Sequence, residues 1–168
     1  MKICMVGTGY VGLVTGTCFA DIGHQVYCVD KDLSKINQLN SGISPIYEPG
    51  LDELIKKNHK AKRLYFTSDL KKAISISDII FICVGTPNIK GSLKVDLSFV
   101  FKCTKEILAI TKKKKIIVTK STVPIGTGDQ IENIIKKKKK LFSVISNPEF
   151  LREGEAIRDF RYPDRIII

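Results

Sequence analysis

Short apolar runs alternate along the chain with longer segments in which apolar residues recur every three or four positions. Apolar runs bounded by turn residues predict buried strands, and the longer spacing predicts helices. We predict strands at residues 3–6, 26–29, 64–66, 78–84, 115–119 and 141–145. We predict helices at residues 11–22, 31–41, 51–57, 70–76, 97–110 and 126–135. A final stretch, 163–168, is predicted to begin a further strand.

This alternation of strands and helices predicts an α/β fold, namely a Rossmann-like, doubly wound parallel sheet with flanking helices. The run 78–84 is apolar throughout after its first residue, which is typical of a central strand covered on both faces. At 168 residues the length fits one domain, since a domain takes about 100–200 residues. The segment 42–50 holds two prolines and two glycines and is predicted to be an irregular loop.

A glycine-rich turn follows the first predicted strand. Gly7, Gly9 and Gly12 stand in G-x-G-x-x-G spacing, and the second strand ends at Asp30. We expect Gly7 to form the tight turn, Gly9 to let a pyrophosphate approach the backbone, and Gly12 to let the helix approach the sheet. A carboxylate about twenty residues on is placed to bind both hydroxyls of an adenosine ribose. The pattern therefore predicts a dinucleotide site.

The formal net charge of +11 raises the possibility of a nucleic-acid partner, but its distribution argues against one. Nine of the positive charges lie in two lysine runs, 112–115 and 136–140, without interleaved aromatic residues. We interpret these runs as solvated helix ends and turns rather than as a nucleic-acid groove.

The remaining composition indicates a cytoplasmic protein. No apolar run approaches the roughly 18 residues that a membrane span needs, and the N-terminus does not resemble a secretory signal. The five cysteines are odd in number and form no C-x-x-C pair. We expect them to be buried free thiols in a reducing compartment, and we expect no membrane partner and no metal site.

Further polar residues follow the later strands. Thr86, Thr122 and Glu149 all come just after predicted strands. Ligands of open parallel sheets bind outside the carboxyl ends of the strands, so we expect these residues to share one sheet edge with the glycine turn. Two assignments stay open at this point. Thr86 either contacts a cofactor or is simply part of a Gly-Thr-Pro turn. Lys35 either reaches the cofactor or is an ordinary surface lysine.

Four motifs, GTGYVGLVTG, VGTP, KSTVPIGT and SNPEFLREG, resemble the UDP-glucose/GDP-mannose dehydrogenase family in their order and spacing. The resemblance spans all 168 residues, but only the family's N-terminal, NAD-binding domain. It implies that UDP-glucose, as substrate partner, is oxidised at C6 to UDP-glucuronate, with two hydride transfers to NAD⁺ and hydrolysis of a thioester. The negative charge of Asp30 should repel a 2′-phosphate, which favours NAD over NADP.

Carried over by position, the resemblance implies roles for individual residues. The residues that would contact NAD are Gly7, Gly9, Tyr10, Val11, Gly12, Asp30, Lys35, Thr86, Thr122 and Glu153. Those that would line the sugar-nucleotide site are Glu149, Phe150, Leu151, Arg152 and Glu153. Glu149 would be the acid/base for thioester hydrolysis, and Thr122 would help to hold the water. Arg152 has an alternative role in a surface salt bridge with Glu149, Glu153 or Glu155.

The resemblance also bears on what the chain lacks. The family's catalytic cysteine and its lysine and asparagine partners lie in the C-terminal domain, beyond Ile168. We therefore expect this chain to be a fragment or a truncated product that binds NAD without turnover, and the full-length protein to be a homo-oligomer. Three alternatives remain: a dehydrogenase of GDP-mannose or of UDP-N-acetyl sugars, a β-hydroxyacid-type NAD oxidoreductase, and a non-catalytic NAD-binding module.

Overall fold

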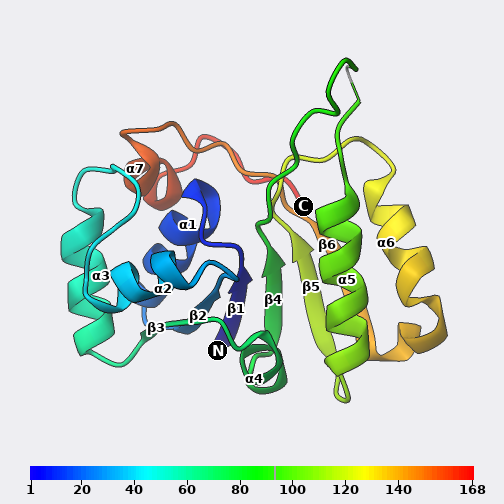
Figure 1. Cartoon of the computed structure of the whole chain (residues 1–168), viewed down its shortest axis with the longest axis horizontal. Coiled ribbons are helices and arrows are strands. Elements are labelled where there is room, and N and C mark those ends of the chain that lie inside the picture. The colour runs from blue at the N-terminus through cyan, green and yellow to red at the C-terminus, as the bar shows by residue number, and fades with distance from the viewer. Residues whose placement is uncertain (93) are drawn as a thin grey trace.

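The computed structural model describes residues 1–92 and 94–168, which form a six-stranded parallel sheet with helices on both faces (Figure 1). The strand order is β3-β2-β1-β4-β5-β6. The strands are β1 (Lys2–Val6), β2 (Gln25–Val29), β3 (Leu64–Thr67), β4 (Ile79–Ile82), β5 (Lys115–Thr119) and β6 (Phe142–Ser146). The helices are α1 (Tyr10–Asp21), α2 (Leu33–Asn40), α3 (Leu51–Lys60), α4 (Leu70–Ile76), α5 (Ser98–Ile110), α6 (Thr127–Ile135) and α7 (Ala156–Arg161), with a 3-10 helix, η1 (Lys136–Leu141).

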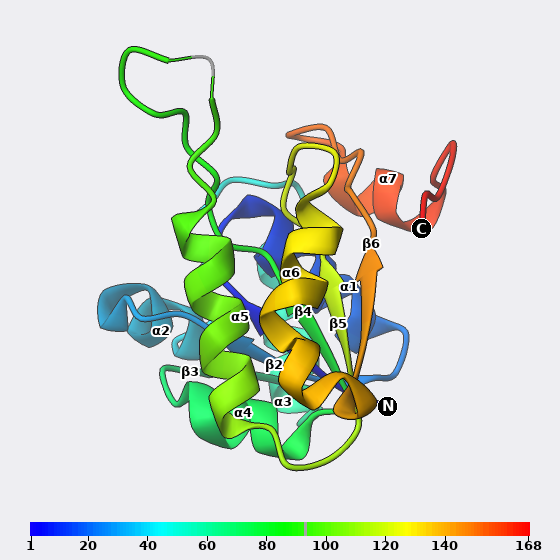
Figure 2. The same ribbon diagram turned by 90° about the vertical axis from the view of Figure 1, so that its right-hand side faces the viewer.

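Successive residues of the central strands point to opposite faces of the sheet and build two separate cores. Ile3 and Met5 of β1 pack with apolar side chains of α1, α2, α3 and α7. Cys4 and Val6 pack on the other face with side chains of α4, α5 and α6. Figure 2 shows α5 and α6 side by side on one face of the sheet and α1 and α7 on the other. Double coverage explains why the central strands are apolar at nearly every position.

The chain order reverses between β1 and β4, and this point sets the position of the site. From β1 the chain runs outward to β2 and β3, and it then returns to β4 on the other side of β1. All strands are parallel, so their carboxyl ends lie at one edge. A crevice at such a reversal is the usual ligand site of an open α/β sheet. The predicted fold class and the shared sheet edge are confirmed.

Local sequence signals account for several helix starts. Asp32 caps α2 by accepting from the amides of Ser34 (2.9 Å) and Lys35 (3.2 Å). Asp69 caps α4 by accepting from the amide of Lys72 (2.9 Å). Each cap satisfies amide donors that would otherwise lack a partner in the first helical turn.

Three features differ from the sequence predictions. The stretch 163–168 forms no strand, and Ile166, Ile167 and Ile168 stay exposed because the stretch is hydrogen-bonded to no neighbouring strand. Helix α7 follows the SNPEFLREG motif and was not predicted. Lys115 is buried rather than solvated, because its ammonium donates to the backbone carbonyl of Ser77 at the end of α4.

Other compositional expectations agree with the structure. All five cysteines are buried and unpaired. The lysines of η1 are exposed, as expected of a solvated run. Among residues 1–92 and 94–168, none of the helices combines the length and the apolar character that a membrane crossing requires.

The central strand β4 provides a direct test of the packing. Ile80 is fully buried among the residues of the second core, so Ile80→Ala should lower the free energy of unfolding by about 2–5 kcal/mol in urea denaturation. Ile125, whose side chain is fully exposed, is the matched control, and Ile125→Ala should change stability by less than about 0.5 kcal/mol. Equal effects of the two substitutions would contradict this packing.

Candidate functional site

The glycine turn brings β1, α1 and the end of β4 into unusually close contact. Gly7 has φ +106°, and a Cβ there would lie 2.5 Å from the carbonyl oxygen of Cys83. A Cβ at Gly12 would lie 2.0 Å from the carbonyl oxygen of Gly7. Both glycines are therefore required by the packing of this chain against itself, as the spacing predicts.

Gly9 differs from these two glycines. A Cβ built on it meets no atom within 4 Å, and its φ of −72° and ψ of −172° are open to any residue. Gly9 is the N-cap of α1, where it makes no side-chain capping bond, and the first turn of α1 carries no acidic residue. The positive end of the helix dipole thus points to open space at the sheet edge, which favours an anion. No atom of the described chain requires the residue at position 9 to be a glycine. The steric need for Gly9 must therefore come from a group that binds here from outside the chain.

Asp30 lies beside this helix end and is held in one orientation. Its Oδ2 accepts from the amide (3.0 Å) and the hydroxyl (2.7 Å) of Thr8, and its Oδ1 accepts from the amide of Asp32 (3.1 Å). Burial alone would raise the pKa of Asp30, but these hydrogen bonds and the charge of Lys35 outweigh it, and the pKa is lowered. Asp30 is therefore an oriented carboxylate at neutral pH, with lone pairs left on both oxygens.

Lys35 is half-buried in the first turn of α2 and helps to lower the pKa of Asp30. This places its charge on the adenosine side of the predicted site. The neighbouring Lys31 turns elsewhere, with its ammonium 5.6 Å from the centroid of the Phe99 ring. This position of Lys35 is compatible with both assignments, the cofactor contact and the surface lysine.

The ends of β4 and β5 are joined by side-chain bonds. The Thr86 hydroxyl donates to the carbonyl of Thr122 at 3.0 Å, and the Ser121 hydroxyl donates to the carbonyl of Val84 at 2.7 Å. Thr86 and Thr122, which are 36 positions apart, are thus brought together at the edge where α1 begins. Thr86 takes part in a specific contact between strand ends, which a plain turn would not need.

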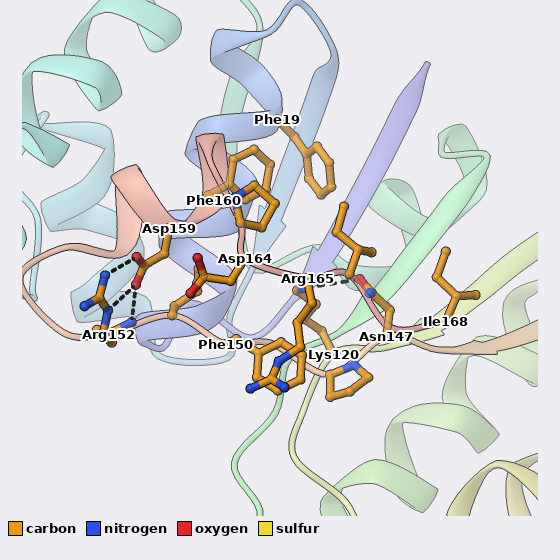
Figure 3. A pocket seen from close by; sticks show the side chains of 14 residues that line it. Phe19, Lys120, Asn147, Phe150, Arg152, Asp159, Phe160, Asp164, Arg165 and Ile168 are labelled. Carbon is orange, nitrogen blue, oxygen red and sulfur yellow. Dashed lines mark hydrogen bonds and ion pairs between the residues drawn. The ribbon is translucent and has the colours of Figure 1, made fainter.

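A cavity of about 620 Å³ opens between the ends of β5 and β6, α7 and the last residues of the chain (Figure 3). Its lining is rich in aromatic and charged side chains: Phe19, Lys120, Asn147, Phe150, Leu151, Arg152, Asp159, Phe160, Asp164 and Arg165 among others. The Lys120 ammonium donates to Asn147 Oδ1 at 3.1 Å, and burial lowers its pKa. The Asn147 amide in turn donates to the carbonyl of Ile167 at 2.7 Å.

Three of the predicted substrate residues, Phe150, Leu151 and Arg152, line this cavity, whereas Glu149 and Glu153 do not. Glu149 is half-buried, and its Oε2 accepts from the amide of Leu151 at 2.6 Å. Glu153 is exposed. Only part of the loop 149–153 therefore faces the cavity.

The guanidinium of Arg152 forms a bidentate ion pair with the carboxylate of Asp159, which was not predicted. Its Nη2 donates to Asp159 Oδ1 at 2.7 Å and its Nε donates to Oδ2 at 3.1 Å, as the dashed lines of Figure 3 show. Glu155 lies 2.9 Å from the same guanidinium, so one of the three partners expected for a surface salt bridge is present. Arg152 therefore ties its loop to α7.

Several residues that shape the site were missed by sequence reasoning. Thr8 orients Asp30, Lys120 and Asn147 line the cavity, and Glu48 contacts the Tyr10 hydroxyl. The side chain of Tyr10 therefore turns toward the loop 42–50, and only its backbone remains for the predicted cofactor contact. A usable signal existed for Glu48 alone, since a single charged residue inside a proline- and glycine-rich loop is unusual.

Comparison with known proteins agrees with this geometry. The family model described as "UDP-glucose/GDP-mannose dehydrogenase family, NAD binding domain" matches residues 1–168. The chain is 55% identical over its whole length to a UDP-glucose 6-dehydrogenase of Rhizobium meliloti and 52% identical over 99% of its length to the UDP-glucose 6-dehydrogenase TuaD of Bacillus subtilis. It spans only 39% and 37% of those two relatives.

Solved structures give the same result. The chain is similar to a GDP-mannose dehydrogenase of Pseudomonas aeruginosa determined as a ternary complex, with a TM-score of 0.93 and 38% identity over 99% of this chain and 40% of that one. It is also similar to a UDP-glucose dehydrogenase of Pyrobaculum islandicum, with a TM-score of 0.90 and 37% identity over 98% of this chain and 39% of that one.

The Arg152–Asp159 pair gives a pH-dependent prediction. Hydrogen bonds from the side chain and the amide of Arg152 lower the pKa of Asp159 to about 2, below the ordinary value of about 3.9. The pair should therefore stabilise the fold fully above about pH 4 and lose this effect as the pH falls through about 2. Urea unfolding should show Asp159→Asn less stable than the wild type at pH 7 and equal to it near pH 2.

The exposed pair of Lys139 and Glu132 (3.3 Å) is the control. Glu132→Gln should produce little change at any of these pH values, because exposed ion pairs contribute little. A stability difference for Asp159→Asn that persists unchanged to pH 2 would show that the ion pair is not its source.

Proposed function

We propose, since the chain belongs to the UDP-glucose/GDP-mannose dehydrogenase family, that residues 1–168 are the N-terminal, NAD-binding domain of an enzyme that oxidises UDP-glucose at C6 to UDP-glucuronate. The single observation that carries the proposal is the start of α1 beside Asp30. There a helix N-terminus with an open glycine cap lies next to an oriented carboxylate, at the point where the strand order reverses.

The residues present fit NAD. The space in front of Gly9, which any side chain at that position would enter, suits a diphosphate approaching the amides of Tyr10 and Val11. Asp30 would hold the adenosine ribose, with Lys35 beside it, and Thr86, Thr122 and Glu153 would reach the rest of the cofactor. When bound, NAD⁺ supplies an acceptor for the hydride that leaves C6 of the sugar. The negative charge of Asp30, which is half-buried and has a lowered pKa, disfavours a 2′-phosphate and so favours NAD over NADP.

The cavity supports a sugar-nucleotide partner for the same domain. Lys120 and Arg165 bring positive charge to it, and Phe150 and Phe160 bring flat apolar surfaces. We assign the sugar-nucleotide contacts to residues 149–153. Glu149 is the proposed acid/base of thioester hydrolysis, and Thr122 helps to hold the water. The name UDP-glucose 6-dehydrogenase on relatives at 55% and 52% identity favours UDP-glucose.

GDP-mannose is the second candidate substrate, because the structural neighbour with a TM-score of 0.93 is a GDP-mannose dehydrogenase. Since the chain spans 39% of its relative from Rhizobium meliloti, we propose that turnover requires residues outside this chain. The five buried free thiols support a reducing compartment, and we propose that the full-length protein works in the cytoplasm as a homo-oligomer.

The cofactor site is tested by a matched pair of glycine substitutions. Gly9→Ala should fold with a stability within about 1 kcal/mol of the wild type, because its Cβ meets nothing in the chain. It should nevertheless weaken NAD⁺ binding at least tenfold in calorimetry. Gly12→Ala should cost roughly 1–3 kcal/mol of stability, because its Cβ would strike the Gly7 carbonyl. Unchanged NAD⁺ affinity in Gly9→Ala would contradict the proposed site.

The proposed reaction is tested by its stoichiometry in the full-length protein. Absorbance should report two NADH formed per UDP-glucose consumed, because two hydrides leave the same carbon. Glu149→Gln should lower kcat by at least about a hundredfold if Glu149 is the general base. Two NADH from GDP-mannose but none from UDP-glucose would select the second candidate. One NADH per substrate, or none with any sugar nucleotide, would overturn the proposal.

A further inference from the structure

The loop 42–50 has no part in the proposed chemistry, yet it holds a buried acid. Glu48 is only 6% exposed, although the preceding Tyr47 is 87% exposed and the following Pro49 and Gly50 lie at the surface. A carboxylate is rarely buried unless its oxygens are hydrogen-bonded, because removing the charge from water is costly. The partners of Glu48 therefore indicate what the loop does.

Those partners come from two segments far along the chain. Glu48 Oε2 accepts from the amide of Gly154 at 2.8 Å and from the hydroxyl of Tyr10. Glu48 Oε1 accepts from the amide of Ile157 at 3.3 Å. The Gly154 amide also donates to the Tyr10 hydroxyl at 3.0 Å, so the three groups form a closed triangle.

Each partner adjoins one half of the proposed site. Tyr10 is the first residue of α1 and follows Gly9 directly. Gly154, with φ +89°, follows Glu153 and ends the SNPEFLREG motif, and Ile157 lies in the first turn of α7. Glu48 thus connects the turn that would face the diphosphate to the loop that would face the sugar nucleotide. The residues that contact one another here lie 38 to 144 positions apart in the chain.

We propose that Glu48 is a positioning residue that fixes the loop 149–154 against the start of α1, so that the cofactor turn and the substrate loop keep one relative geometry. The expected effect on enzyme kinetics rests on the proposed function, whereas the expected ordering of the loop 149–154 does not. Glu48 acts through Tyr10 and Gly154 and has no assigned contact with cofactor or substrate. Its charge matters because only an ionised carboxylate offers acceptors alone to all three donors.

Glu48→Gln is the informative variant, since it keeps the shape but turns one acceptor into a donor that faces other donors. Hydrogen exchange of the chain should become at least tenfold faster at the amides of Gly154 and Ile157, with no change in β1, β4 and β5. Asp52→Asn is the matched control. Asp52 accepts from the amide of Ser44 at 3.0 Å in the same loop but does not reach α7, so exchange at these two amides should stay within about twofold of the wild type.

The phenol of Tyr10 gives a spectroscopic readout that general destabilisation would not reproduce. The pKa of Tyr10 is raised to about 12. Burial of the phenol is the larger cause, and the hydrogen bond to Glu48 is the next. In an alkaline absorbance titration, Glu48→Gln should move one phenol of the protein toward the ordinary value of about 10. Tyr10→Phe should remove that phenol from the titration and identify it.

The kinetic consequence is read in the full-length protein. Glu48→Gln should raise KM for UDP-glucose about tenfold, because a misplaced loop loses binding to the sugar nucleotide, and should lower kcat about tenfold, because the proposed base Glu149 lies on the same loop. The NAD⁺ dissociation constant should stay within about threefold of the wild type. If Glu48→Gln does not fold, Tyr10→Phe tests the positioning role of Glu48 instead. It keeps the carboxylate and both amide contacts, and it should still speed exchange at Gly154 about threefold.

The results that would overturn the proposal are specific. Exchange that rises equally throughout the sheet would make Glu48 a general stabiliser. A KM that does not change, or an equal KM change in Asp52→Asn, would remove the positioning role. A wild-type enzyme inactive on every sugar nucleotide would reject the proposed function, while the exchange and phenol titrations would still decide whether Glu48 orders the loop.

Discussion

The close approach of α1 to the sheet at Gly7 and Gly12 sets the rest of the structure. Backbone atoms of β1, α1 and the end of β4 meet there at distances that leave no room for a Cβ. Because the helix is held so near the sheet, its first turn lies at the carboxyl edge, between the strands where the chain order reverses. The position of the helix dipole, and with it the preference for an anion, follows from this contact.

Electrostatics and hydrogen bonding then build on that position. Thr8, inside the same turn, orients Asp30, and the Thr86–Thr122 bond joins the next two strand ends at the same edge. The loop 149–154 is attached twice, through Arg152 to Asp159 and through Gly154 to Glu48. The proposed cofactor and substrate elements, which are more than a hundred residues apart in the chain, are thereby held together, and a reaction between two bound molecules requires such a fixed geometry.

Much of this arrangement could be predicted from the sequence, because the strands are buried on both faces and their apolar runs are continuous. All six strands and six of the helices lie where the pattern placed them, most of them within one or two residues. The stretch 163–168 shows the limit of this reasoning. Its apolar residues resemble a strand, but strand formation depends on a hydrogen-bonding neighbour that a local pattern does not report. Helix α7 was missed because six residues are too few to display a helical period.

The site was predictable where it depends on the backbone and much less so where it depends on side-chain pairs. Gly7 forms the tight turn and Gly12 allows the close approach of helix and sheet, as expected. Both requirements recur at a fixed glycine spacing, which a sequence displays directly. The partners of Arg152 and Glu48 were not found, because each pair forms only once the loops have folded across α1 and α7. Lys115 was misjudged for a related reason: its ammonium donates to the carbonyl of Ser77, which follows α4 and lies 38 positions away in the chain.

The central claim is that the start of α1 and Asp30 together form the NAD site, and a crystal structure of this chain grown with NAD⁺ tests it most directly. The account predicts the diphosphate against the amides that follow Gly9 and the adenosine ribose hydroxyls on the Asp30 carboxylate. NAD⁺ bound at the opposite edge of the sheet, or bound here with its ribose away from Asp30, would contradict it.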